Sequence, residues 1–300
     1  MNQSRKADLL LVSATILAGF GWVFSKQTIS EMPPFMFIGL RFLCAALLLF
    51  PFCFDVMKRL PARDLAKASS VGLLQGIALL FWIYSVSISD ALGEGAFIMS
   101  LSMLFVPLIS WFVFHSRPNR SFWIAFPIAV VGLYALSSAQ RWTLSGSQFS
   151  FLLSALTTAL LFNLNSRYSK SIPTIPLTFV QFLLTGLFSL LMSLVFETWP
   201  SSFSQMTWIW FIASVIPATC FRFLLQIRGQ KNTSATNASI IMILEPVWTV
   251  LLSVVIYGEV LTVNKITGGI LILIALVAYR FIPQLLQKLK QRRSKNIREL

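Results

Sequence analysis

Long apolar runs alternate along this chain with short polar segments. Each run is close to the ~20 residues that a helix needs to cross the hydrocarbon core of a bilayer. The runs do not alternate between apolar and polar residues as membrane-spanning strands do, so helices are favoured. The pattern therefore predicts an all-α integral membrane protein with ten transmembrane helices, at residues 9–29, 35–54, 69–88, 93–114, 122–139, 149–168, 175–196, 207–227, 235–256 and 266–283.

One set of residues occurs twice, at an offset of 139 positions: Ala96, Ser100, Met103, Pro107 and Ser110 recur as Ala235, Ser239, Met242, Pro246 and Thr249. The spacings of four, three, four and three place each set on one face of a helix. Five spans per copy make the second copy enter the membrane from the opposite side, which is the arrangement of many transporters. We therefore expect two inverted five-helix repeats, at 1–140 and 141–283, followed by a basic tail at 284–300.

The composition agrees with a membrane protein, because 11% of the residues are charged and soluble domains carry about 25%. The net charge of +14 follows from the distribution of Lys and Arg, which are held on the cytoplasmic side of membrane proteins. With both termini cytoplasmic, only Lys26, Arg141 and Lys265 of the 24 lie in outer segments. The basic residues are dispersed over short loops, so we expect contact with membrane lipid and no binding of nucleic acid.

Several function classes are disfavoured by what the chain contains. Cys44, Cys53 and Cys220 have no paired spacing, and His115 is the single histidine, so neither a disulfide framework nor a metal site is expected. No cofactor is expected either. The membrane interior offers one carboxylate and no HExxH motif, which argues against an intramembrane enzyme. A phosphate-binding GxxxxGK[ST] loop is also missing from the sequence, so ATP is not the direct energy source.

Three ionisable residues lie deep within predicted spans: Arg41, Arg222 and Glu245. A charge at the centre of a membrane helix costs roughly 2.5–3.5 kcal/mol, so such residues usually have a partner or a function. Glu245 and Arg222 differ in depth by about four residues, or roughly 6 Å, and we expect them to pair, with Arg41 as the alternative partner. Glu245 is then either a site for a proton or substrate, or half of a permanent ion pair that holds the helices in register.

Polar and aromatic side chains also recur at helical spacing on several spans, and these faces should look inward because polar groups avoid lipid. They predict a wet, partly aromatic cavity. The candidate binding residues are Trp22, Gln75, Trp82, Asn163, Asn165, Gln226 and Trp248, and Lys26 joins the three intramembrane charges as a candidate for charge coupling. Any of the tryptophans is equally compatible with simple packing.

Pro107 and Pro246 occupy equivalent positions in the two repeats, and each removes a backbone hydrogen bond in mid-span. Both are candidate hinges at which spans four and nine bend during transport, although a static kink is the alternative.

The run Leu244–Thr262, with Pro246 in mid-span and Gly258-Glu259 at the span end, resembles the second-repeat motif of the EamA family in the drug/metabolite transporter superfamily. The stretch from Gly21 to Lys26, followed by Pro33-Pro34 and Arg41-Phe42, is similar to the opening of that family's first repeat. The resemblance implies motif positions at Trp22, Lys26, Arg41, Pro246, Gly258 and Glu259. The first repeat departs from it, with Asn119-Arg120 at the position equivalent to Gly-Glu. A role of Glu259 shared by both halves is therefore not expected, and Glu259 is expected to be a helix-end or packing residue at the outer face rather than a substrate ligand.

That resemblance implies a ten-helix carrier with cytoplasmic termini and a central cavity between spans one, three, four, six, eight and nine. The expected function is secondary active export of amino acids or their derivatives across the bacterial inner (plasma) membrane, by proton coupling or exchange. S-adenosylmethionine or another nucleoside-like metabolite is the alternative cargo, and an intramembrane enzyme or a non-transporting scaffold is the alternative of another class. One chain holds both repeats, so a monomer is sufficient and a homodimer is compatible with the sequence.

Overall fold

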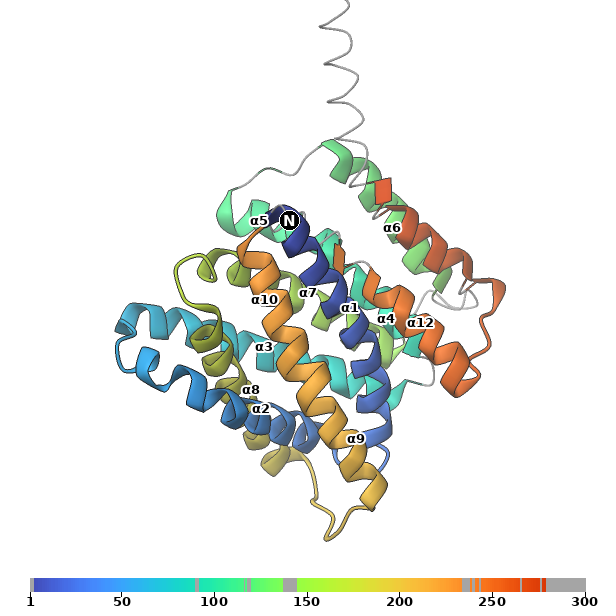
Figure 1. Cartoon of the computed structure of the whole chain (residues 1–300). Coiled ribbons are helices and arrows are strands. Elements are labelled where there is room, and N and C mark those ends of the chain that lie inside the picture. The colour runs from blue at the N-terminus through green and yellow to red at the C-terminus, as the bar shows by residue number, and fades with distance from the viewer. Residues whose placement is uncertain are drawn as a thin grey trace, which may run out of the picture.

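The computed structural model describes residues 3–89, 92–115, 117, 120–136, 145–233, 238, 241, 242, 244–264, 266–275, 277 and 278, and these are helical apart from short connections (Figure 1). The helices are α1 (Gln3–Thr28), α2 (Pro34–Met57), α3 (Ala62–Ile88), α4 (Leu92–Ser100), α5 (Ser102–Phe114), α6 (Arg120–Leu136), α7 (Gly146–Tyr168), α8 (Thr174–Phe196), α9 (Gln205–Val215), the π-helical turn η1 (Ile216–Phe221), α10 (Arg222–Lys231) and α12 (Leu244–Tyr257). Ala235, Ser239, Trp142 and the predicted tail at 284–300 lie outside the described residues.

Local sequence signals explain where several helices begin. Pro33, Pro61 and Pro173 precede α2, α3 and α8, and a proline fits there because the first turn of a helix has no use for its missing N–H. Ser145 and Gln148 form a reciprocal capping box at the start of α7. Ser204 accepts a hydrogen bond from the backbone N–H of Thr207 and so caps α9.

In each half of the chain, the first helix packs against helices of the other half. The first helix of the first half, α1, contacts α9, α10 and α12, and the first helix of the second half, α7, contacts α3, α4 and α5. Each first helix thus lies against the third and fourth helical segments of the other half. The second helices, α2 and α8, pack on each other, as do α4 and α12. This pattern of packing is what an internal duplication predicts.

Two glycines allow α2 and α8 to approach closely. A Cβ added to Gly39 of α2 would lie 2.9 Å from the backbone nitrogen of Leu190, and one added to Gly186 of α8 would lie 2.8 Å from that of Leu43. The two contacts are equivalent: in each, a glycine of one helix lies against the backbone of the other helix. Small residues at such crossings are the usual means of tight helix packing in membranes.

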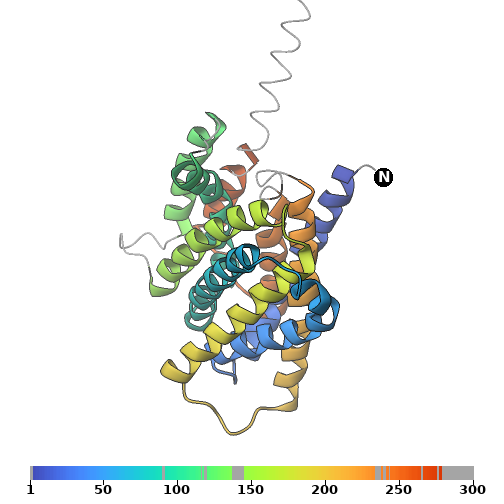
Figure 2. The same ribbon diagram turned by 90° about the vertical axis from the view of Figure 1, so that its left-hand side faces the viewer.

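A peripheral pair of helices lies at one edge of the molecule. Figures 1 and 2 show α6 beside the helix at residues 266–275, apart from α2 and α8. A Cβ on Gly132 of α6 would be 2.9 Å from the backbone oxygen of Gly268, so the two backbones are in contact there. This pair lies outside the part of the bundle that builds the site.

Seven of the helices in the described residues are long and apolar enough to cross a membrane, and shorter apolar helices occur at Phe122–Gly132, Leu244–Tyr257 and Ile266–Ala275. The shorter helices fall where the sequence predicts spans five, nine and ten. Since they border residues outside the described part of the chain, the number ten stays a prediction. Large apolar side chains are exposed around the bundle, among them Phe52, Phe112 and Val255, and lipid is the solvent that suits such a surface.

Within the part of the chain that the structure describes, two of the spans are not regular α-helices. The fourth predicted span is divided at Leu101 into α4 and α5, six residues before the candidate hinge Pro107. The eighth contains η1, a π-helical turn that includes Pro217. Such turns inside α-helices are frequent at functional sites, and both interruptions border the cavity described next.

Candidate functional site: a polar cavity between the two halves

A cavity of about 130 Å³ lies at the centre of the bundle, between the two halves of the chain. A water molecule needs roughly 10–15 Å³ of such space, so the cavity holds on the order of ten waters or one small molecule. Its walls are mainly apolar, with polar side chains at a few points. Among the residues that line it are Trp22, Arg41, Gln75, Trp82, Asn165, Arg222, Gln226, Glu245 and Pro246, all of which the sequence singles out.

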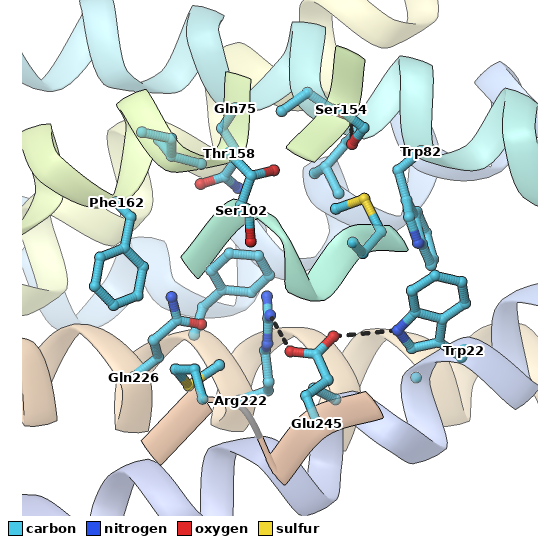
Figure 3. A pocket seen from close by; sticks show the side chains of 18 of the residues that line it. Trp22, Gln75, Trp82, Ser102, Ser154, Thr158, Phe162, Arg222, Gln226 and Glu245 are labelled. Atoms are coloured by element: carbon cyan, nitrogen blue, oxygen red, sulfur yellow. Dashed lines mark hydrogen bonds and ion pairs between the residues drawn. The ribbon is translucent and has the colours of Figure 1, made fainter. Parts of the chain in front are cut away.

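Glu245 is the centre of the polar cluster in this cavity (Figure 3). Its Oε2 lies 3.5 Å from Nη2 of Arg222, and its Oε1 accepts a hydrogen bond of 3.1 Å from the indole Nε1–H of Trp22. The side chains of Arg222 and Glu245 are 18% and 21% exposed. The carboxylate is thus paired yet open to the cavity, which is the condition for exchanging a partner with a bound molecule.

Aromatic rings form one end of the cavity. The ring centroids of Trp22 and Trp82 are 5.1 Å apart in an edge-to-face arrangement, and Phe151 packs on Trp22 at 5.8 Å. Edge-to-face contacts of this kind stabilise a ring pair beyond the area that it buries. The packing fixes the Trp22 indole in the orientation that directs its N–H toward Glu245.

Arg41 does not pair with Glu245 and has a different environment. Its Nε donates to Oγ1 of Thr219, its Nη1 donates to Oγ of Ser25 at 2.9 Å, and its Nη2 donates to the backbone oxygen of Ala218 at 3.1 Å. Ala218 and Thr219 belong to η1, so the π-helical turn supplies two of the three acceptors.

Several polar atoms on the cavity wall have no hydrogen-bond partner among the described residues. They are Oε1 and Nε2 of Gln75, Oε1 of Gln226 and Nε of Arg222. Figure 3 shows Gln75 and Ser102 on one side of the cavity and Gln226 and Arg222 on the other. Buried polar atoms without a partner are rare in proteins, and these four belong to residues that line one cavity.

Four of the residues predicted for the site lie elsewhere. Lys26 donates to the backbone oxygens of Val86 and Ser89 at the end of α3, a position that suits a cation because a helix C-terminus is negative. Asn163 donates to the backbone oxygens of Val106 and Ala159, which joins α7 to α5.

Trp248 packs against α1: a Cβ added to Gly19 of α1 would lie 2.7 Å from Cβ of Trp248. Pro107 is buried in α5 and is not among the residues that line the cavity. Met103 and Met242, which precede Pro107 and Pro246 by one helical turn, do line it. A proline leaves the carbonyl four residues earlier without its donor, so each proline affects a residue of the wall.

Sequence reasoning missed a group of small polar residues on the wall, namely Ser100, Ser102, Ser154 and Thr158. Ser154 bonds to the backbone oxygen of Ala78. Ser102 lies just after the interruption at Leu101, and Figure 3 shows it pointing into the cavity. The spacing of four residues between Ser154 and Thr158 was the available signal.

Glu259 is a helix-end residue, away from the cavity wall. Gly258 ends α12 with a φ of +63°, a conformation that glycine adopts without strain. The chain then turns so that Oε2 of Glu259 accepts from the backbone N–H of Gly93 at 3.0 Å and from the hydroxyl of Ser253. The Gly-Glu pair therefore joins the end of α12 to the start of α4, where the helix dipole favours a carboxylate.

These features define a helical membrane protein with an internally duplicated bundle and a polar cavity between its halves. The comparison with protein families assigns it further. The model of the EamA-like transporter family matches residues 5–138 and again residues 146–280, and the chain therefore belongs to that family, part of the drug/metabolite transporter superfamily.

Curated relatives agree with this assignment. An uncharacterized transporter of Archaeoglobus fulgidus is 27% identical over 90% of this chain and 84% of its own length. The uncharacterized transporter YoaV of Bacillus subtilis is 24% identical over 89% of this chain and 94% of its own. One solved structure superimposes with a TM-score of 0.69 at 18% identity, covering 93% of this chain and 98% of the other, which supports the fold. The chain is thus an integral membrane protein of a transporter family.

Proposed function

We propose that this protein is a secondary active transporter that exports small metabolites, amino acids or their derivatives, across the plasma membrane by alternating access. The observation that carries the proposal is the cavity between the two halves, which is lined by the Arg222–Glu245 ion pair, by Gln75, whose amide is unbonded, and by Gln226, whose amide oxygen is unbonded. In carriers built from repeats, the substrate binds at the interface of the repeats near the middle of the membrane.

We further propose ten spans in two inverted repeats, with both termini in the cytoplasm of a bacterial cell. Two matches to one family model support the duplication, and the asymmetric distribution of Lys and Arg supports the orientation. One chain contributes both sides of the cavity, so a monomer is sufficient.

In the proposed mechanism Glu245 binds either a proton or the cationic group of the cargo. Both species compete for one carboxylate, and competition at a site that opens alternately to the two sides couples their opposite movement. Trp22 and Arg222 position the carboxylate at the cavity wall. If the cargo moves only against another metabolite, the same competition gives exchange.

A nucleoside-like metabolite such as S-adenosylmethionine is the second candidate cargo. The specific observation that favours it is the presence of two indoles, Trp22 and Trp82, on the same wall as Glu245. Aromatic rings bind the faces of nucleobases by stacking. An amino acid fits the mainly apolar walls with fewer unbonded groups, so it is preferred.

The experiment is uptake by proteoliposomes of the purified protein, using an isotope-labelled panel of amino acids and adenosyl metabolites. Each compound is tested with an imposed pH gradient, without one, and with unlabelled compound inside the vesicles. Saturable uptake that follows the gradient supports a proton-coupled carrier, and uptake that requires internal compound supports an exchanger. If a folded sample moves nothing in this panel, the proposal fails and an intramembrane enzyme or a scaffold takes its place.

A further inference from the structure

Among the described residues, Arg41 is a buried cation without an anionic partner. The residue is 5% exposed, and its three hydrogen bonds go to the hydroxyls of Ser25 and Thr219 and to the backbone oxygen of Ala218. A guanidinium has five N–H groups and stays charged in proteins. Two N–H groups therefore remain for which the described residues provide no acceptor.

The energetic position of Arg41 differs from that of Arg222. A buried charge is costly unless it is both hydrogen-bonded and compensated by an opposite charge. Arg222 has its compensation in Glu245. Arg41 has hydrogen bonds alone, and the rings of Phe37 and Phe42, whose centroids lie 5.4 Å and 5.9 Å from its Cζ, add only a weak attraction.

Arg41 also lies on the cavity wall. Arg41 and Gly21 both line it, and a Cβ built on Gly21 would lie 3.7 Å from Nη2 of Arg41. The same Cβ would lie 3.2 Å from Cβ of Ala218, so the missing side chain at Gly21 leaves a narrow space beside Nη2 free of the chain's own atoms. The residue after Gly21 is Trp22, which bonds to Glu245, so two consecutive residues of α1 stand beside the two charged groups.

We propose that Arg41 binds a carboxylate group of the cargo. This inference rests on the proposed function and names the chemical group that the site selects. Arg41, Arg222 and Glu245 together give the wall one uncompensated positive charge. A carboxylate brings one negative charge and accepts two parallel N–H bonds from an arginine.

A doubly charged phosphate is a poorer match, because the other cation among the described residues of the wall, Arg222, is already paired with Glu245, and Glu245 repels the second negative charge. For an amino acid, the proposed function and this inference together give a binding partner for each charged group. Its carboxylate lies at Arg41, and its ammonium group lies at Glu245, where it competes with the proton.

The test compares probes that differ only in charge. The purified wild-type protein in detergent is titrated with leucine, with leucinamide, which lacks the carboxylate, and with 4-methyl-2-oxopentanoate, which lacks the ammonium. Binding is followed by thermal stabilisation. The same titrations with phenylalanine and phenylalaninamide, and with inorganic phosphate at equal ionic strength, extend the comparison. We expect at least one carboxylate probe to stabilise the protein and the matching amide and phosphate to leave it unchanged.

Arg41→Gln and Arg41→Lys then test the residue. Loss of a charge-assisted contact weakens binding about tenfold or more, so Arg41→Gln should bind the carboxylate probe at least that much more weakly, and Arg41→Lys should recover part of the loss. The control is Arg228→Gln, which removes an exposed arginine from the same span as Arg222 and should bind like the wild type.

Equal stabilisation by acid and amide in the wild-type protein overturns the inference without any variant, even if Arg41→Gln does not fold. An equal loss of affinity for acid and amide in Arg41→Gln also overturns it, because a purely structural residue acts on both. Carboxylate binding that depends on Arg41, in a protein that transports nothing, supports this inference and refutes the proposed function.

Discussion

Trp22 donates its indole N–H to the carboxylate of Glu245, which joins α1 of the first half to α12 of the second at the cavity wall. The two residues are 223 positions apart in the chain. The contact crosses the boundary between the two halves of the chain. In the proposed alternating access the halves move relative to each other, so this hydrogen bond lies where that movement would be felt.

The first prediction concerns this contact. Trp22→Phe keeps an aromatic ring but removes the donor, and Glu245→Gln removes the charged acceptor. In a double-mutant cycle of unfolding in detergent, we expect a coupling of ~1 kcal/mol between the two. Trp82→Phe with Glu245→Gln is the control, because Trp82 packs on Trp22 and the structure gives it no bond to Glu245. Additive effects of Trp22→Phe and Glu245→Gln would contradict the contact.

The second prediction distinguishes a proton-coupling role of Glu245 from a purely structural role. If the carboxylate takes the proton, Glu245→Gln should abolish the response of uptake to an imposed pH gradient while exchange of labelled for unlabelled cargo persists. Asp64→Asn, which alters a surface pair with Lys67, should respond like the wild type. A gradient response that survives in a well-folded Glu245→Gln protein would assign Glu245 a structural role.

Many residues that line the cavity can be predicted from the sequence, because polar side chains are unfavourable in lipid. Gln75, Arg222 and Gln226 are polar residues within apolar runs, and such residues are forced to face inward whatever the details of packing. The helical period then identifies the neighbours on the same face, and this reasoning also finds Trp22 and Trp82. The prediction needs no knowledge of how the helices are ordered in space.

The same reasoning fails where a side chain has a nearer partner. Asn163 and Lys26 face inward, yet each bonds to backbone oxygens of a neighbouring helix and does not line the cavity. Helical spacing gives a direction around one helix, and the partner depends on which helix lies opposite. The interruption at Leu101 could not be predicted from the sequence either, because the apolar run continues through it without glycine or proline.

Helix ends were also predicted imperfectly. The third span was expected from residue 69, and α3 begins at Ala62. Hydropathy locates the part of a helix that lies in lipid, whereas hydrogen bonding continues into the polar segment. Asp64 and Lys67, a partly buried pair one helical turn apart, belong to this extension.

The third prediction is a pH dependence of stability from the connection after α1. The backbone N–H of Ser204 and the hydroxyls of Thr207 and Ser204 hold the pKa of the Glu31 carboxyl below its ordinary value of 4.5. A carboxyl with a lowered pKa in the folded state stabilises the fold above its unfolded pKa and loses this effect as the pH falls through the folded value. Glu31→Gln should therefore reduce the loss of thermal stability below about pH 4.5. An unchanged acid limb in melting curves would contradict this.

The fourth prediction concerns the prolines. Pro107→Ala and Pro246→Ala each restore an N–H that can bond to the carbonyl one turn earlier, at Met103 or Met242 on the cavity wall. We expect both variants to bind cargo normally and to transport it more slowly. Pro127→Ala is the matched control, since Pro127 lies inside α6, outside the cavity wall. Normal rates in both repeat variants would remove the hinge proposal.

The fifth prediction uses the glycine beside Arg41. In Gly21→Ala the new Cβ would lie 3.7 Å from Nη2 of Arg41, an ordinary contact, and 3.2 Å from Cβ of Ala218, which requires a shift of a few tenths of an ångström. The methyl group fills the narrow space beside Nη2 of Arg41. We expect weaker binding of carboxylate probes with little change in thermal stability.

Gly146→Ala is the control for this variant, because a Cβ at Gly146 meets only Cδ1 of Ile88 at 3.9 Å. The effect on KM should exceed that on the maximal rate, since the substitution blocks a binding group and leaves the helices free to move. If Gly21→Ala binds leucine as well as the wild type does, the carboxylate does not approach Arg41 past Gly21, and the binding pose proposed for the cargo is wrong.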